Sequence, residues 1–455
     1  MLTKTTKGLW GKLARLMPLI AILSLLLAAC GGTATPVPPT ATTMVEVATA
    51  TVPAMVEAPT ATTEAAVTEA TATTAAVAEA TPTKVKGAAS QEGVLTLWVH
   101  KVAVQAVSNV AADFTAKYGV QVSVQEVDFG GIRDDLKTAG PAGEGPDIIV
   151  GAHDWLGELV ANGLVEPLDL GAKVADFDPV GIQAFTYDGK LYGLPYGLEA
   201  VALIYNKDLV PTAPTTWEEL KTVARQLQTD GKVDQGYGLQ TGTADPYHTY
   251  PIVTGFGGYV FKQNADGTYD PTDVGLDNAG GQAAMKELDQ MVKDGLLRQN
   301  ISGQTLDSLF VEGKVAMVIG GPWRLGDLRK ANMNYGIAKI PTINNQPVPF
   351  VGAQGFMVSA FGKNKEVAKA FLTEYMSTPE AHQTIFDADP RIPALLSVQQ
   401  AVTDPDIKSF AESAAGGQPM PAIPQMSAVW TDWTKALDLV FQQAEDPVKA
   451  ITDAA

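Results

Sequence analysis

The chain is poor in the residue types that several common functions require. It has one cysteine and four histidines among 455 residues, so an intrachain disulfide and a cysteine-based metal cluster are excluded. The histidines show no HExxH or paired metal spacing, and we expect neither a metal nor a cofactor. A formal net charge of −18 argues against nucleic acid as a partner, because phosphates are bound by basic surfaces.

The N-terminal residues have the pattern of a secretion signal. Basic residues within 4–15 precede an uncharged run over 16–29, and about 14 apolar residues are too few to span a bilayer comfortably. The following Leu27-Ala28-Ala29-Cys30-Gly31 resembles a bacterial lipoprotein cleavage box. We predict a signal peptide over residues 1–30 and lipidation of Cys30, which would anchor the protein on the outer side of the cytoplasmic membrane, in a periplasm or at the cell surface. A plain signal peptide with an incidental cysteine is the alternative.

Residues 31–92 are predicted to form a disordered stalk. From residue 32 to residue 92 there is no aromatic residue, leucine or isoleucine, and threonine, alanine, proline and valine dominate. Such a segment has no side chains with which to build a core, and its prolines interrupt helices. An O-glycosylated mucin-like segment is the rival interpretation of the same composition.

The remaining chain alternates between strand and helix patterns. Val94–His100 is a short, mostly apolar run, typical of a buried strand. Apolar residues at helical spacing follow from Val107 to Tyr118, Gly119 is a suitable C-cap, and the next valines alternate with polar residues. This pattern predicts a strand–helix–strand unit, and therefore a parallel or mixed sheet.

Two glycine-containing segments, Gly197–Val201 and Gly352–Gly355, are interpreted as crossings between two lobes, with a third near Asp404–Pro405. The predicted fold is an α/β two-lobed clamp, in which helices flank mixed sheets and a ligand binds in the cleft. Gly352 and Gly355 would ease the rotation of the lobes. The predicted boundaries are 93–198 plus 353–404 for lobe 1, and 202–350 plus 406–455 for lobe 2.

An ordered set of motifs from residue 93 to the C-terminus resembles the maltose/maltodextrin-binding proteins of ABC sugar importers. The motifs include Gly145-Pro146-Asp147-Ile148-Ile149, Ala152-His153-Asp154, Leu203-Ile204-Tyr205-Asn206-Lys207-Asp208, Thr216-Trp217-Glu218-Glu219, Gly321-Pro322-Trp323 and Ile423-Pro424-Gln425-Met426-Ser427-Ala428-Val429-Trp430. Each motif alone is weak, and the ordered set is specific.

This resemblance implies a periplasmic-binding-protein-like clamp that closes on an oligosaccharide and delivers it to a membrane permease driven by a cytoplasmic ATPase. The chain has no GxxxxGK[ST] segment, which is consistent with ATP hydrolysis on a partner. We expect a monomer that is a receptor and not an enzyme.

The resemblance also implies which residues contact the sugar. Trp323 and Trp430 match family tryptophans that stack on sugar rings, whereas Trp433 is expected to pack in the core. Tyr247 matches a stacking tyrosine, and Asp245 stands where the family has a longer glutamate. Flat aromatic rings suit the apolar faces of sugars.

Two further carboxylates are expected at hydroxyl groups of the ligand. Glu199 matches a family carboxylate beside a crossing, and Asp154 matches one that follows a buried strand. A helix N-cap is the alternative role for Asp154.

Most departures from the family concern the first lobe, and one near the C-terminus replaces a family arginine with Thr434. The polar and charged family residues after the first strand correspond to His100, Val102 and Ala103, so two charged contacts are lost and His100 remains as a candidate. An aromatic family position is Gly151, and a family arginine is Trp155, which is either a new stacking platform or a lid. A changed preference for sugar length or linkage is the resulting hypothesis.

Two rival functions remain open. The first is a receptor for a non-glucan sugar or for another solute class. The second is a glycoside hydrolase, because pairs among Asp154, Glu199 and Asp245 could act as acid and nucleophile.

Overall fold

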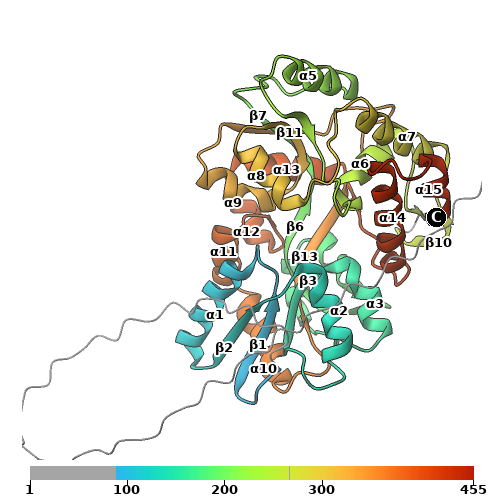
Figure 1. The fold of residues 1–455 in the computed structure, drawn as a ribbon. Helices are drawn as coiled ribbons and strands as arrows, with labels where there is room; N and C mark the ends of the chain where they lie inside the picture. The colour runs from blue at the N-terminus through green and yellow to red at the C-terminus, as the bar shows by residue number, and fades with distance from the viewer. Residues whose placement is uncertain (1–88, 266) are drawn as a thin grey trace, which may run out of the picture. The chain divides into compact units, whose positions relative to one another are not determined.

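A computed structural model describes residues 89–265 and 267–455 (Figure 1). The predicted signal peptide, Cys30 and nearly all of the predicted stalk lie outside the described residues. Ser90 is buried, and its hydroxyl donates to Asp147 Oδ1 at 2.7 Å. Its backbone N–H donates to the Gly145 carbonyl at 2.9 Å. Ser90 is therefore packed against the folded part, although it lies upstream of Gly93, where the first lobe was predicted to start.

The first sheet has seven strands in the order β14-β6-β13-β3-β1-β2, with β15 paired to β13. Strands β2 and β3 are parallel to β1, whereas β13 is antiparallel to both β3 and β6. The mixed sheet and the predicted strand–helix–strand unit are confirmed. The strands are β1 (Val94–Val99), β2 (Gln121–Glu126), β3 (Ile148–Ala152), β6 (Gly193–Ala200), β13 (Phe350–Val358), β14 (Ile392–Pro393) and β15 (Gln418–Pro419).

The second sheet has four strands in the order β12-β7-β11-β8. Strand β11 is antiparallel to β7 and parallel to β8, so this sheet is also mixed. Two short ribbons, β4–β5 and β9–β10, complete the β structure of the described residues. These strands are β7 (Ala202–Asn206), β8 (Gln235–Gly238), β11 (Val315–Gly320), β12 (Tyr335–Ala338), β4 (Thr186–Tyr187), β5 (Lys190–Leu191), β9 (Phe261–Gln263) and β10 (Tyr269–Val274).

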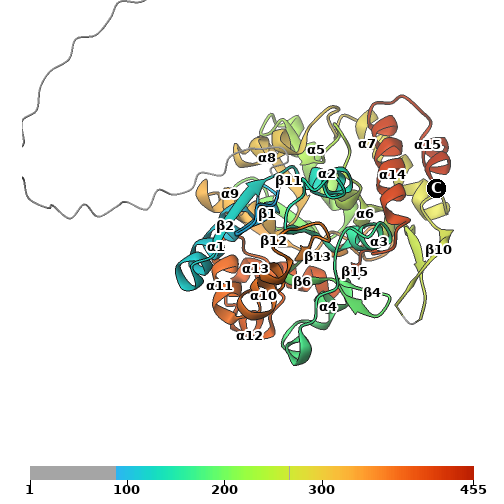
Figure 2. The ribbon, with the colours of Figure 1, turned by 90° about the horizontal axis from the view of Figure 1, so that it is seen from below.

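Helices flank both sheets, and Figures 1 and 2 both show α14 and α15 side by side near the C-terminus. Short 3-10 helices are η1 (His153–Trp155), η2 (Gly171–Asp176) and η3 (Pro322–Arg324), and η4 (Phe371–Met376) is a π-helix. The α-helices are α1 (Val104–Tyr118), α2 (Phe129–Ala139), α3 (Leu156–Ala161), α4 (Pro179–Ala184), α5 (Trp217–Thr229), α6 (Pro246–Phe256), α7 (Ala279–Lys293), α8 (Gly303–Val311), α9 (Leu325–Lys330), α10 (Lys365–Ala370), α11 (Pro379–Ala388), α12 (Leu396–Ala401), α13 (Pro405–Ala415), α14 (Met426–Phe441) and α15 (Pro447–Ala454).

Local sequence signals explain where several helices begin and end. Thr216 accepts a hydrogen bond from the Glu219 N–H, and the Glu219 carboxylate accepts one from the Thr215 N–H, as in a capping box. Gly119 ends α1 in the left-handed conformation, with a φ of 73°. The α-helix α10 is not continued as an α-helix, because the π-helix η4 follows it directly.

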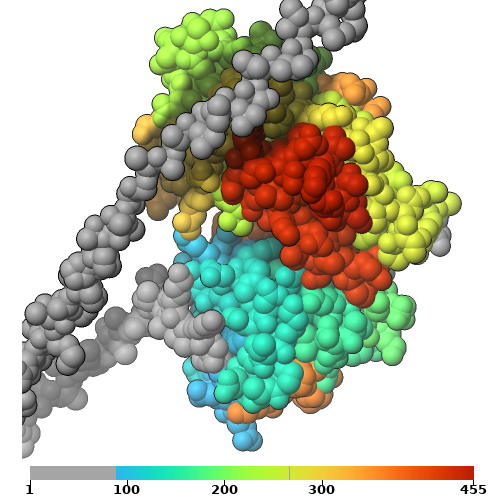
Figure 3. Space-filling view, turned by 45° about the vertical axis from the view of Figure 1, so that its right-hand side comes forward, coloured from blue at the N-terminus to red at the C-terminus, as the bar shows by residue number. Residues whose placement is uncertain are grey.

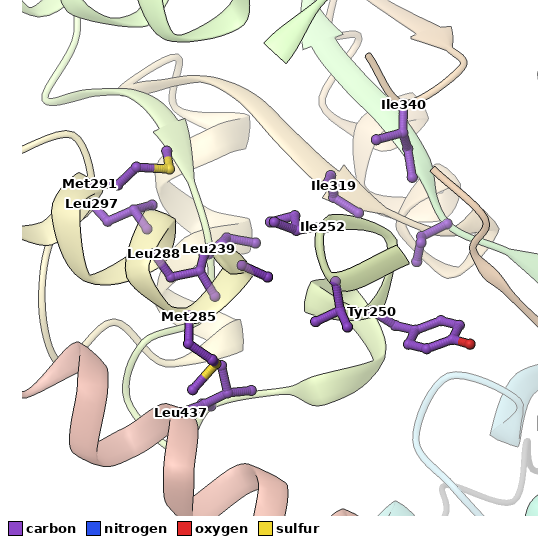
Figure 4. Close-up of a cluster of buried hydrophobic side chains, with 14 of the residues drawn as sticks. Leu239, Tyr250, Ile252, Met285, Leu288, Met291, Leu297, Ile319, Ile340 and Leu437 are labelled. Atoms are coloured by element: carbon purple, nitrogen blue, oxygen red, sulfur yellow. The ribbon is translucent and has the colours of Figure 1, made fainter. Parts of the chain in front are cut away.

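The four-stranded sheet is covered by α6, α7 and α14, which share one hydrophobic core (Figure 4). Met285 and Leu288 of α7 are fully buried in it, together with Leu437 of α14 and Ile319 of β11. Each such side chain contributes about 1.5–3 kcal/mol by leaving water. This core stabilises the walls from which several candidate site residues extend.

The two segments interpreted as crossings, Gly197–Val201 and Gly352–Gly355, are neighbours in the seven-stranded sheet. Gly352 in β13 pairs with Glu199 in β6, so Glu199 lies inside a strand. Only Val201 separates β6 from β7, and it joins the two sheets directly. The number of crossings between lobes stays a prediction.

Gly355 has a packing role within β13. A Cβ at this position would lie 2.5 Å from the Phe185 ring and 2.8 Å from the Leu194 carbonyl oxygen. Close packing therefore accounts for this glycine, and the predicted easing of rotation is not needed to explain it.

Candidate functional site

A cleft of about 990 Å³ has walls from segments that adjoin both sheets. Lys101 and Val102 follow β1, and Asp389 and Pro390 precede β14. The other wall includes residues of α8, η3 and α9, among them Asp307, Trp323 and Arg324. This volume is at the upper end of the range for small-molecule sites, so the cleft has room for more than one sugar unit.

Four aromatic side chains, Tyr247, Trp323, Phe350 and Trp430, form a chain of ring contacts that we call the aromatic row. Ring centroids are 6.0 Å apart for Tyr247 and Trp323, 6.2 Å for Tyr247 and Phe350, and 5.9 Å for Phe350 and Trp430. Phe350 is fully buried, whereas the other three side chains are half-buried. The structure thus brings the three predicted stacking residues together.

The backbone positions the rings of the row. Trp323 lies in η3 directly after β11, and a Cβ at Gly321 would lie 2.1 Å from its ring, so only glycine leaves room for the indole. Trp430 belongs to the start of α14. Trp433 is fully buried with its ring parallel to that of Trp430, which confirms its predicted packing role.

Asp154 is buried in η1, at the carboxyl end of β3, and accepts a hydrogen bond of 2.8 Å from Trp430 Nε1. Its side chain makes no helix-cap hydrogen bond, so the N-cap alternative is wrong. Burial raises the pKa of Asp154, and the neighbouring His153 and the Trp430 N–H oppose that rise. Asp154 therefore connects the β3 end to α14.

His153 makes a second connection of this kind. The Ala353 N–H donates to its Nδ1 at 3.1 Å, so Nε2 carries the proton and donates to the Met420 carbonyl at 3.1 Å. Burial lowers the pKa of His153, which keeps the ring neutral. Figure 3 shows the orange and red surface of the C-terminal segments in contact with the cyan surface around α2 and α3.

Trp155 and His100 are packed with Phe129, and we call these three residues the inner cluster. Trp155 is only 4% exposed, and its ring fills the space that a side chain at Gly151 would take, 2.0 Å from the ideal Cβ. The Phe129 ring lies 4.8 Å from that of Trp155 and 5.1 Å from that of His100. Phe129, which was not predicted, is 43% exposed and covers both.

His100 is a neutral group at neutral pH. Burial lowers the pKa of His100 to about 3, and the positive charge of Arg391 adds to this effect. Its Nε2 has no hydrogen-bond partner among the described residues. His100 could thus offer one polar atom to a ligand, but its side chain is buried in this conformation.

Glu199 belongs to a buried polar network. Its carboxylate forms an ion pair with Arg391 and accepts a hydrogen bond of 3.0 Å from Gln354 Nε2. Arg391 Nε also donates to Asp389 Oδ2 at 2.8 Å. Sequence reasoning missed Arg391, Asp389 and Gln354, because Glu199, around which they gather, lies far from them in the chain. The network links β6, β13 and the segment before β14, so it orients Glu199.

Asp245 is the N-cap of α6. Its Oδ1 accepts from the Tyr247 N–H at 2.9 Å, and its Oδ2 lies 2.7 Å from His248 Nδ1. Burial by itself would raise the pKa of Asp245, but His248 and the backbone hydrogen bonds lower it overall. A carboxylate has about four acceptor positions, so a role in ligand binding is compatible with this cap.

The described residues were also considered as metal ligands and as membrane-spanning helices. Within 89–265 and 267–455, no group of three or more histidine, cysteine, aspartate or glutamate side chains is arranged to hold a metal ion. No helix in these same ranges has the length and apolar character needed to cross a membrane.

Comparison with known families gives a match over most of the folded part. Residues 109–415 match the family described as bacterial extracellular solute-binding protein. This range includes the four-stranded sheet, every strand of the seven-stranded sheet except β1 and β15, the buried network around Glu199 and the residues of the row except Trp430.

Individual relatives cover still more of the chain. A galactooligosaccharide-binding protein of Bacillus subtilis (strain 168) is 32% identical over 381 residues, which are 80% of this chain and 89% of that protein. The maltodextrin-binding protein MdxE of the same organism is 31% identical over 397 residues, 83% and 92% of the two chains. A maltooligosaccharide ABC transporter solute-binding lipoprotein of Streptococcus pneumoniae (strain ATCC BAA-255 / R6) is 30% identical over 379 residues, 79% and 86%.

Proposed function

We propose that this chain, which belongs to the bacterial extracellular solute-binding protein family, is the oligosaccharide receptor of an ABC importer. The observation that carries this proposal is the aromatic row, whose member Trp323 lines the cleft. Three half-buried rings, Tyr247, Trp323 and Trp430, offer flat apolar faces next to acceptor and donor groups. Sugars combine apolar ring faces with hydroxyl edges, and such a wall complements both.

Maltodextrin is the ligand that we place first. Relatives named for maltodextrin and maltooligosaccharide binding are about as similar to this chain as the relative named for galactooligosaccharide binding. A galactooligosaccharide is therefore the second candidate. The two differ in linkage and in the orientation of one hydroxyl group, and site residues that donate and accept in fixed directions distinguish such differences.

Closure of the two lobes around the ligand would distinguish the loaded receptor from the empty one. We propose lobe 1 as 93–198 plus 353–404 and lobe 2 as 202–350 plus 406–455, with three crossings between them. In this division, the hydrogen bonds from Trp430 to Asp154 and from His153 to the Met420 carbonyl would run between the two lobes. The ligand must bind the closed form more tightly than the open one in order to shift the population.

The permease subunits, with their cytoplasmic ATPase, are the proposed partners of the closed form. A lipid on Cys30 would hold the monomeric receptor on the outer side of the cytoplasmic membrane, in a periplasm or at the cell surface. We propose a binding protein without hydrolase activity. The buried network supports this, because Glu199 is paired with Arg391 and is therefore a poor proton donor.

Calorimetric titration of residues 31–455 tests the proposal. The panel contains maltose, maltotriose, longer maltodextrins, cyclodextrin, trehalose and β-1,4-galactotriose. Saturable binding of a glucan that is lost in Trp323→Ala supports the receptor, and preference for galactotriose selects the second candidate. No binding across the panel would overturn the sugar assignment, and release of reducing ends from maltodextrin would overturn the non-enzymatic role.

A further inference from the structure

Arg324 and Asp307 form an ion pair in the cleft. The proposed function above gives this pair no role. Arg324 follows Trp323 in η3, and Asp307 lies in α8. Arg324 Nη1 is 2.6 Å from Asp307 Oδ1, and both residues line the cleft. The pair thus lies next to the aromatic row.

Arg324 is buried without a complete set of partners. It is 8% exposed, and its Nε has no hydrogen-bond partner among the described residues. Its side chain lies along Gly320, where a Cβ would be 2.6 Å from Nε, so the backbone leaves space for it there. A buried donor without an acceptor is costly, and such donors in native sites commonly serve a ligand or bound water.

The charges around Arg324 indicate which ligand it suits. Asp307 neutralises the guanidinium, and Asp245 adds a further negative field. An anion would therefore meet little net positive charge, whereas a neutral hydroxyl or ring oxygen can accept a hydrogen bond from the guanidinium. A planar guanidinium that is paired with a carboxylate through one nitrogen keeps its remaining donors in fixed directions.

We propose that Arg324, held by Asp307, donates a hydrogen bond to an oxygen of the sugar unit next to the one stacked on Trp323. This inference rests on the proposed receptor function and adds a specificity-determining residue to it. Trp323 and Arg324 are consecutive residues of η3 and both line the cleft, so apolar and polar contacts would come from the same wall.

Calorimetry on residues 31–455 tests this with maltotriose and β-1,4-galactotriose. We expect Arg324→Met to bind the preferred trisaccharide at least tenfold more weakly, and Arg324→Lys to recover part of that loss. Arg225→Met is the matched control. Arg225 lies on α5, pairs with Asp294 at 3.0 Å and does not line the cleft. The affinity of Arg225→Met should stay within twofold of the wild type.

Monodeoxy analogues of the bound trisaccharide separate contact from a merely structural role. The wild type should discriminate against one analogue that lacks the acceptor, and Arg324→Met should bind that analogue and the parent sugar equally well. Unchanged affinity of Arg324→Met, or unchanged discrimination in it, would overturn the inference while leaving the receptor function intact. If Arg324→Met does not fold, Asp307→Asn replaces it, because the Asp307 side chain is partly exposed, at 42%, and the freed guanidinium should lose the same discrimination. Absence of binding by the wild type would overturn the receptor function and this inference together.

Discussion

The aromatic row and the inner cluster contain similar side chains but expose them differently. In the row, Tyr247, Trp323 and Trp430 are all half-buried around a buried Phe350. In the inner cluster, Trp155 and His100 are buried beneath an exposed Phe129. Aromatic residues at the ends of strands can therefore be ligand platforms or supports for other residues, and burial decides between the two roles.

The largest effect on stability is expected for Trp155→Ala. Loss of the buried indole beside Gly151 leaves a cavity and should lower the free energy of unfolding by about 3–5 kcal/mol. Urea unfolding of residues 31–455 measures this, with Trp323→Ala as the half-buried comparison. A small loss of stability together with a large loss of sugar affinity would instead make Trp155 a ligand platform.

Trp323→Ala should weaken sugar binding strongly and lower stability only a little, in contrast to Trp155→Ala. We expect binding of maltotriose to weaken by about 2 kcal/mol, roughly 30-fold, because one ring of apolar contact is lost. Its free energy of unfolding should change less than that of Trp155→Ala. Calorimetry gives the affinity, and equal loss of stability in both variants would remove the distinction between the row and the inner cluster.

Acidification should affect the inner cluster through His100. Its pKa is lowered to about 3 by burial and then by Arg391, whereas an unfolded histidine has a pKa of about 6.5. The unfolded state therefore binds more protons in this window, so stability is complete above pH 6.5 and falls as the pH decreases toward 3. The change from pH 7 to pH 5 should be roughly 2 kcal/mol from this residue.

His382 provides a comparison for the pH effect. Burial lowers the pKa of His382 to about 4, so it contributes a loss of the same sign. Urea unfolding at pH 7 and pH 5 should show a loss of stability smaller than that of the wild type by roughly 2 kcal/mol in His100→Asn, and by a similar amount in His382→Asn. A pH dependence in His100→Asn equal to that of the wild type would mean that His100 is not a neutral buried group.

The smallest effect is expected for Phe129→Ala. Its exposed ring should contribute less than about 1 kcal/mol to unfolding. If Phe129 is the surface that the inner cluster offers to a sugar, calorimetry with maltotriose should show a several-fold loss of affinity. Tyr118→Ala is the control, because Tyr118 is similarly exposed, at 49%, and lies at the other end of α1 from the cleft wall. Equal affinities of both variants and the wild type would restrict stacking to the row.

The strands, the main helices and the mixed α/β character could be predicted from the sequence, because these depend on local periodicity, caps and turns. Sequence reasoning also selected the members of the row that are half-buried, through motif resemblance. It did not find Arg391 beside Glu199 or Arg324 beside Asp307, since neither pair has a local signature. It left Trp155 open between platform and lid.

The amino-acid sequence by itself determined the α/β pattern, the βαβ unit at β1 and β2, the capping box at Thr216 and the acidic, cysteine-poor composition. These features follow from interactions within a few residues or from composition alone. Only the tertiary structure decided that Trp155 is covered by Phe129, that Asp154 accepts from Trp430, and that Glu199 is paired with Arg391. Burial and ion pairing depend on residues distant in the chain, and only packing of the two sheets and their helices brings those residues together.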